Sequence, residues 1–182
     1  MQKAKQRSEI AQQDKWRIED IYATDEAWEA DYNECIRRAK EKCAYQGRLA
    51  ESAQILYQAL KESDEADLLV EHVYVYAFMK YYEDTANAVY QEMSGRAQAA
   101  VTKLSEKYAF LTPEILAIDQ KKMQEYLNSD TLALYRHALE DILAKKEHAL
   151  SEKEERLLAM AGQVTASPNE IFSKFNNADV KF

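Results

Sequence analysis

Apolar residues recur every three or four positions along most of the chain, and this spacing is typical of one face of an α-helix. The clearest stretch runs from residue 86 to residue 108. Its apolar positions are Ala86, Val89, Tyr90, Met93, Ala97, Ala100, Val101, Leu104 and Tyr108. We therefore expect a long helix there, with this apolar stripe facing the core.

An earlier helix is predicted to begin after Thr24, because a threonine hydroxyl can accept a hydrogen bond from the first free backbone N–H groups. Asp25 and Glu26 follow in the first turn, where the helix dipole favours negative charge. Apolar residues then continue at helical spacing to Cys43, and Gly47 is expected to end or follow this helix.

Two more helices are expected between these stretches. The first covers residues 49–60, and the next is predicted to begin at a cap formed by Ser63 or Asp64. A cap at Asp84 or Thr85 would then start the long helix described above.

The segment at residues 73–79 could be read as a strand, because it is rich in β-branched and aromatic side chains. Its length decides against a strand. Apolar residues extend from Leu68 to Tyr82 without a turn signal, which is long for a strand. A helix that is apolar on most sides is typically a central, buried one.

Shorter helices are predicted in the last part of the chain. Thr112 and Pro113 indicate a helix start, because proline is well tolerated at the first helical position. This helix is expected to end near Ile118. Later helices are predicted to begin at the caps Asp119, Asp130, Ser151 and Ser167.

These patterns predict an all-α fold, a bundle of about six to eight helices. Only three glycines and two prolines occur, which agrees with long helices and few tight turns. We expect an irregular amino-terminal arm at residues 1–24, a long-helix bundle at 25–110 and shorter helices at 111–182. The apolar anchors expected to hold the arm on the body are Trp16, Ile18, Ile21 and Tyr22.

Charge and hydropathy exclude several classes of protein. The net charge is −8, with 24 Lys and Arg against 32 Asp and Glu, so there is no basic footprint for nucleic acid. No run approaches the roughly 18 apolar residues of a membrane span. No apolar run follows the basic first residues, so a secretory signal is not expected. We expect a cytoplasmic protein with no nucleic-acid or membrane partner.

The chain shows no motif that could form a complete active site. It has three histidines, His72, His137 and His148, and no H-E-x-x-H pattern. His137 and Glu140 share one helical face, but a surface or structural histidine is the better interpretation. Cys35 and Cys43 would lie about 12 Å apart on a continuous helix, too far for a disulfide. We therefore expect no catalytic residue, no metal ligand and no cofactor in this chain.

Tyrosine is the most unusual part of the composition. There are twelve, and several fall between residues 74 and 82. A tyrosine can line a peptide groove, since its ring gives contact area and its hydroxyl gives a hydrogen bond. The same residues could instead be the larger members of a helical core, so both interpretations stay open.

Several stretches, in order and spread over nearly the whole chain, resemble the amino-terminal region of oligoendopeptidase F, a family of bacterial zinc metallopeptidases similar to thimet oligopeptidase. They are Asp14–Tyr22 with Asp25–Trp28, Tyr74–Ala77 with Lys80–Thr85, Pro113–Leu116 with Tyr135–Ile142, His148–Glu155, and Asn169–Phe172 with Asn176–Phe182.

The resemblance implies a parent enzyme whose helical fold encloses a substrate channel. In such enzymes an H-E-x-x-H helix and a later Glu bind zinc, and the motif Glu activates water. Those residues would lie in a later part of the polypeptide. The chain also stops on Val180-Lys181-Phe182 in the middle of a pattern, so we expect it to be truncated from a longer polypeptide.

The leading hypothesis is therefore the non-catalytic amino-terminal lobe of a zinc endopeptidase that hydrolyses short peptides. Tyr74, Tyr81 and Tyr82 are the candidates to face the channel. The residues expected to dock on the rest of the polypeptide, and to cause self-association without it, are Phe172, Phe175 and Phe182. The alternative is a stand-alone helical module that binds proteins or peptides.

Overall fold

The computed structural model describes residues 9–148, 168, 171, 172 and 175. The chain divides into two compact units, Lys5–Leu143 and a second formed by Met1–Ala4 with Ala144–Phe182. Within the described residues the regular elements are α-helices and short 3₁₀ turns, and none is a strand. The prediction of an all-α fold is confirmed, including the helical state of residues 73–79. The three-part division of the chain stays a prediction.

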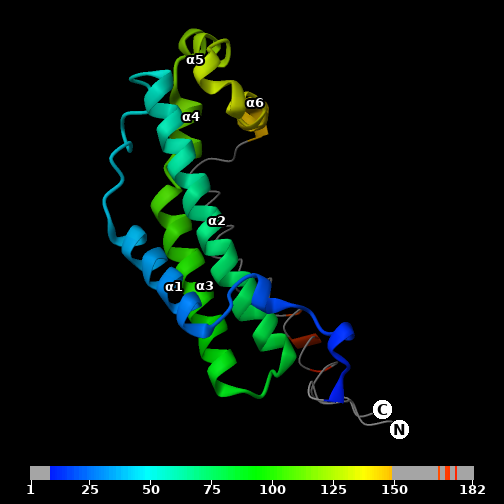
Figure 1. The fold of residues 1–182 in the computed structure, drawn as a ribbon. Helices are drawn as coiled ribbons and strands as arrows, with labels where there is room; N and C mark the ends of the chain where they lie inside the picture. Colours follow the sequence, from blue (N-terminus) through cyan, green and yellow to red (C-terminus); the bar gives the residue numbers. More distant parts are fainter. Residues whose placement is uncertain (1–8, 149–167, 169–170, 173–174, 176–182) are drawn as a thin grey trace. The chain divides into compact units, whose positions relative to one another are not determined.

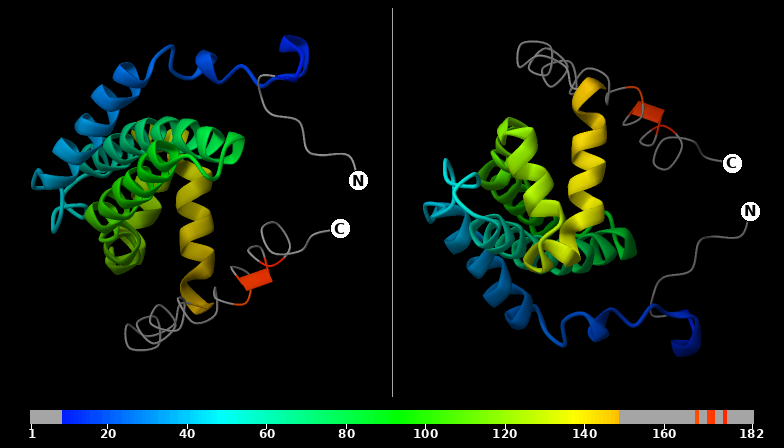
Figure 2. Two further views of the ribbon diagram at one scale, coloured as in Figure 1. Left: turned by 90° about the horizontal axis from the view of Figure 1, so that it is seen from below. Right: turned by 90° about the horizontal axis from the view of Figure 1, so that it is seen from above.

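Three long helices build the larger unit. They are α1 (Asp25–Lys40), α2 (Ala53–Glu83) and α3 (Ala88–Tyr108). α2 and α3 lie side by side along their lengths, and α1 packs against both (Figures 1 and 2). The side chains at the centre of this packing are almost completely buried, among them Trp28, Leu56, Val73, Ala97 and Leu104.

Two of the predicted caps are present. The Thr24 hydroxyl accepts a hydrogen bond from the Ala27 N–H at 3.3 Å and begins α1. Asp119 accepts from the N–H groups of Lys121 at 3.0 Å and Lys122 at 3.2 Å and begins α5 (Gln120–Leu127). Both caps are local features of the sequence, which explains why they could be predicted.

The two helices predicted before residue 84 are one continuous helix of 31 residues. Ser52 is its N-cap, and its hydroxyl accepts from the Ile55 N–H at 3.2 Å. The predicted cap at Ser63 is wrong, because Ser63 lies inside α2 and is buried. No glycine or proline interrupts the sequence between Gly47 and Gly95, so nothing stops the helix there.

Two other boundaries also differ from the prediction. α3 begins after Asn87, whose side chain accepts from the Val89 N–H at 2.9 Å, while Asp84 is the C-cap of α2. α1 ends at Lys40, and Cys43 lies in the loop that follows, where it is nevertheless buried. Gly47 in this loop has φ +81°, a conformation that favours glycine.

Short elements close one end of the unit. α4 (Leu111–Ala117) begins before the predicted cap Thr112. After α5, the helix expected to follow the cap Asp130 is divided into a 3₁₀ segment, Asp130–Tyr135, and α6 (Arg136–Ala144). Two more 3₁₀ turns lie in the arm and one follows α6: Gln12–Asp14, Ile18–Asp20 and Lys145–His148. Within residues 130–144, Leu132, Tyr135 and Leu139 are buried in the core, and Ile142 is partly buried against it.

The amino-terminal arm is held mainly by Ile18 and Tyr22, which are buried. The Tyr22 ring meets the Tyr76 ring of α2 edge to face at a centroid distance of 5.4 Å. Trp16, predicted as an anchor, is 74% exposed. The predicted caps Ser151 and Ser167 lie outside the described residues. No helix in the described part of the chain is long and apolar enough to cross a bilayer.

Candidate functional site

The tyrosines fall into two groups. In the first group, buried rings donate their hydroxyl hydrogen bonds from one element of the fold to another. The pairs are Tyr22 to Asp31 at 2.7 Å, Tyr76 to Asp25 at 2.8 Å, Tyr108 to Glu62 at 3.0 Å, Tyr135 to Asp64 at 2.7 Å and Tyr126 to the Ala50 carbonyl at 3.0 Å. These five residues belong to the core, as the second of the two sequence interpretations proposed.

Burial and the acceptor carboxylate together raise the pKa of Tyr22, Tyr108 and Tyr135 well above the ordinary tyrosine value. Burial is the larger cause in each case, because it disfavours the phenolate. These hydroxyls therefore stay protonated and keep donating. They are structural ties between elements.

The second group forms an aromatic cluster near the carboxyl end of α2. The Tyr74 and Phe78 rings stack at a centroid distance of 4.2 Å. Phe78 also meets Tyr81 at 6.2 Å and Tyr82 at 6.1 Å, and the last two rings lie 5.3 Å apart. Tyr82 is 72% exposed, while Tyr74 and Tyr81 are half-buried. Within the described residues, none of these three hydroxyls is seen to form a hydrogen bond.

The cluster lies on the face of α2 that points away from α1. Tyr74, Phe78 and Tyr82 are four residues apart, so they share one face of the helix. Tyr76, two residues after Tyr74, points to the opposite side and donates to Asp25 of α1. Tyr74 is partly buried against the core, whereas Phe78, Tyr81 and Tyr82 are not among the described residues that pack on it.

Two carboxylates continue the same face toward the amino end of α2. Asp67 and Glu71 precede Tyr74 by seven and three residues, and both are exposed. We call the set Asp67, Glu71, Tyr74, Phe78, Tyr81 and Tyr82 the α2 stripe. Its acidic part begins about one turn after Asp64 of the same helix. Asp64 itself accepts the hydrogen bond from the Tyr135 hydroxyl.

The acidic part of the α2 stripe has no cationic partner in the described part of the chain: the ion pairs of this unit involve other carboxylates. Partial desolvation, and then the negative charges of Asp64 and Glu71, raise the pKa of the Asp67 carboxyl. A nearby cation would relieve this repulsion.

A small hollow lies beside Tyr82. Its volume is about 270 Å³, and Trp16, Met79, Tyr82 and Glu83 line it. Two aromatic rings, a thioether and a carboxylate therefore converge next to the aromatic end of the α2 stripe.

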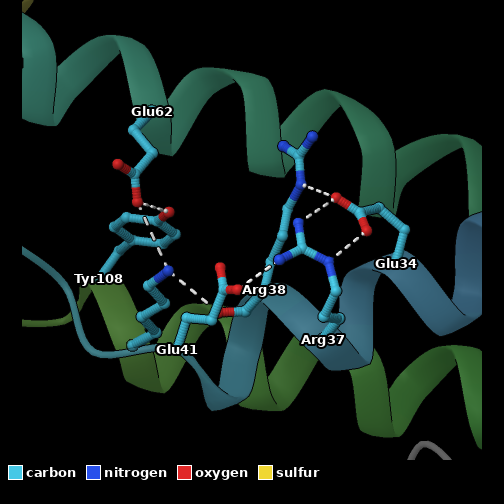
Figure 3. A network of polar contacts seen from close by, with 7 residues as sticks. Glu34, Arg37, Arg38, Glu41, Glu62 and Tyr108 are labelled. Atoms are coloured by element: carbon cyan, nitrogen blue, oxygen red, sulfur yellow. Dashed lines mark hydrogen bonds and ion pairs between the residues drawn. The ribbon is translucent and has the colours of Figure 1, made fainter.

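A separate polar network joins the carboxyl end of α1 to the other two long helices (Figure 3). Glu34 accepts from Arg37 at 2.7 Å and from Arg38 at 2.8 Å. The Lys107 ammonium of α3 donates to the Arg38 carbonyl at 3.0 Å and to Glu62 of α2 at 3.4 Å. This network satisfies the end of α1 and holds the bundle together, and its charges are neutralised within it.

The network predicts a pH-dependent stability. Hydrogen bonds from Arg37 and Arg38 lower the pKa of Glu34 from 4.5 to about 2. A carboxyl whose pKa is lower in the folded state stabilises that state fully above its unfolded pKa, and this contribution disappears as pH falls from about 4.5 toward 2. Urea unfolding should therefore show Glu34→Gln to be less stable than the wild type at pH 7, with the difference shrinking toward pH 2. A difference that stays constant over that range would contradict the assignment.

His72 and His137 lie on different helices. His72 is exposed on α2, and His137 is exposed on α6 with its imidazole 3.7 Å from the Asp141 carboxylate. Among the described residues, no three His, Cys, Asp or Glu side chains are grouped so that they could hold a metal ion. Cys35 and Cys43 are free and buried.

The residues predicted to dock on the rest of the polypeptide are partly described. Phe172 is 64% exposed and Phe175 is 59% exposed, while Phe182 lies outside the described residues. Ile171, which sequence reasoning did not select, is also exposed at 68%.

Sequence reasoning missed Asp67, Glu71 and Phe78 as members of the stripe. Their spacing from Tyr74 is three, four or seven residues, so a search of this helical face for polar as well as apolar side chains could have found them.

Comparison with known proteins shows which proteins this chain is similar to. The family model described as Oligopeptidase F, an amino-terminal region of M3 peptidases, matches residues 114–182. Oligopeptidase PepF of Bacillus subtilis is 41% identical over 97% of this chain, and the oligoendopeptidase F homolog of Lactococcus lactis is 40% identical over 98% of it. This chain is similar to the amino-terminal region of oligoendopeptidase F.

The fold agrees with this relationship. The crystal structure of oligoendopeptidase-F from Enterococcus faecium matches 86% of this chain with a TM-score of 0.71 and 30% sequence identity. The match covers 30% of that oligoendopeptidase-F chain, and the chain spans 26% of the B. subtilis relative and 30% of the L. lactis relative. It corresponds to less than a third of the proteins that it resembles.

Proposed function

We propose that this chain is the non-catalytic amino-terminal lobe of an oligoendopeptidase F-like zinc metallopeptidase that hydrolyses short peptides in the cytoplasm. The observation that carries the proposal is the extent of the similarity: it covers 97–98% of this chain but at most 30% of each curated relative. A lobe of a larger peptidase accounts for both the nearly complete coverage of this chain and the low coverage of its relatives.

In this proposal, the zinc and the groups that activate water belong to another part of the polypeptide. The sequence has no H-E-x-x-H, and the described residues contain no group that fits a metal ion. Zinc bound there would supply Lewis-acid and water-activating chemistry. The residues of this chain do not take part in that step.

The lobe would help to wall the substrate channel. The α2 stripe supports this role, because its rings form a cluster that is only partly buried and its tyrosine hydroxyls can bond to a peptide backbone. Tyr74, Tyr81 and Tyr82 are the proposed channel-facing residues. Phe172, Phe175 and Phe182 are proposed to dock on the rest of the polypeptide and to promote self-association when it is absent.

The test is reconstitution. The chain is fused to the part of B. subtilis PepF that follows its matching region, and hydrolysis of a quenched fluorescent peptide is measured. We expect the fusion to cleave the peptide, and the chain alone to cleave none and to hold no stoichiometric zinc by metal analysis. One tightly held zinc per isolated chain, or a folded fusion with no activity, would overturn the proposal.

A stand-alone peptide-binding module is the second candidate, since Asp67, Glu71 and Tyr82 of the α2 stripe are exposed on this chain itself. The gene sequence after the codon for Phe182 separates the two. An H-E-x-x-H motif in that sequence favours the peptidase lobe, and a natural stop codon favours the module.

A further inference from the structure

The α2 stripe changes chemistry along its length. Asp67 and Glu71 present carboxylates at one end, and Tyr74, Phe78 and Tyr82 present rings at the other. At about 100° per residue, all of these positions fall within roughly a third of the helix circumference. A ligand lying along this face would meet both ends.

The acidic end of the α2 stripe, Asp67 and Glu71, is suited to bind a positively charged group. Asp67 lies near the like charges of Asp64 and Glu71, and after partial desolvation these charges raise the pKa of its carboxyl. The lysines of the same helix that form ion pairs use other carboxylates: Lys61 pairs with Glu65, and Lys80 pairs with Asp25 of α1. Charge complementarity therefore favours a cationic group from outside the described part of the chain.

The aromatic end is an independent feature. Phe78 contacts three other rings, and Tyr82 is largely exposed beside the hollow of about 270 Å³. Exposed aromatic faces stack on aromatic or guanidinium groups and pack on apolar side chains. Such a surface favours a ring or another large apolar side chain of the ligand.

We infer that the α2 stripe is a selectivity subsite for peptides that carry a basic side chain and, a few residues away, an aromatic side chain. The inference deepens the proposed function, on which it rests for the peptide nature of the ligand. Such a peptide would place its guanidinium or ammonium group against Asp67 and Glu71. Its aromatic side chain would lie on Phe78 and Tyr82.

The helix sets the spacing between these two groups. Glu71 and Phe78 are seven residues apart, which is about 10 Å along the helix axis at 1.5 Å per residue. An extended peptide advances about 3.3 Å per residue. The subsite therefore matches a basic and an aromatic side chain about three positions apart.

The test is an NMR titration of the full ¹⁵N-labelled chain with the heptapeptide Gly-Arg-Gly-Gly-Phe-Gly-Gly, blocked at both ends. The comparison peptide has glutamate in place of the arginine. We expect the basic peptide to bind at least about tenfold more tightly, and to shift the amide signals of the α2 stripe. Equal affinities for the two peptides, or shifts confined to other residues, would overturn the inference.

Variants at each end of the α2 stripe test which end binds which peptide side chain. Asp67→Asn with Glu71→Gln should remove most of the preference for arginine. Phe78→Leu with Tyr82→Leu should weaken binding of both peptides by about threefold or more, since ring stacking is lost while apolar area remains. Glu92→Gln is the matched control, because Glu92 is an exposed carboxylate on α3 and does not belong to the stripe. An equal loss in the control would contradict the assignment.

The outcome can be separated from that of the proposed function. If the fusion cleaves peptides but treats the basic and acidic substrates alike, the lobe assignment holds and the subsite does not. If the fusion is inactive while the isolated chain still prefers the basic peptide, the subsite holds and the peptidase assignment fails.

Discussion

Replacing Trp28 with alanine is expected to lower the free energy of unfolding by about 3–5 kcal/mol, the range for removing a large buried aromatic side chain. Trp28 is 1% exposed and stacks on Tyr32 at 5.4 Å. Its indole N–H donates to the Val73 carbonyl of α2 at 2.8 Å. The Arg96 guanidinium of α3 lies 5.2 Å from the same ring. One side chain thus joins all three long helices.

The measurement is urea unfolding followed by far-ultraviolet circular dichroism, which does not depend on tryptophan fluorescence. Trp28→Phe separates the contributions, because it keeps a ring but leaves the Val73 carbonyl without its donor, at a cost of about 1–3 kcal/mol. Leu134→Ala is the control, since Leu134 is 77% exposed. A Trp28→Ala loss no larger than that of the control would contradict the packing described here.

The second large loss of stability is expected on replacing Glu114 of α4. Its carboxylate accepts from the Gly47 N–H at 2.9 Å and from the Leu49 N–H at 2.7 Å. Glu114→Ala leaves both donors without this acceptor, at an expected cost of about 2–4 kcal/mol. Glu114→Gln retains one acceptor oxygen and should lose roughly half as much.

Hydrogen exchange of the Gly47 and Leu49 amides gives a local readout for Glu114, since both should exchange faster in the alanine variant. Glu125→Ala is a matched control, because Glu125 is an exposed acid on the neighbouring α5. Unchanged exchange at both amides, together with unchanged stability, would show that the carboxylate does not hold this loop.

Local features explain which parts of the fold could be predicted. Caps such as Thr24 and Asp119 depend on residues within three positions, and the apolar face of α3 depends on one repeated spacing. The predicted cap at Ser63 failed because a serine that can cap a helix is also small enough to be buried within one. Only the surrounding helices determine which role it takes.

Long-range pairs could not be predicted in the same way. Glu114 binds an N–H group 67 residues earlier in the chain, and Tyr135 binds Asp64, 71 residues before it. No spacing in the sequence marks these partners. The same limit applied to the tyrosines: the sequence showed that they are concentrated, but only their contacts separate the buried ties from the rings of the α2 stripe.

The uninterrupted length of α2 has an evolutionary consequence. The helix runs for 31 residues, about 46 Å at 1.5 Å per residue, with packing on one side and the stripe on the other. Exposed positions outside the packing usually tolerate substitution with little loss of stability. Substitutions at the exposed stripe positions could therefore alter the proposed peptide preference one residue at a time, at little cost in stability.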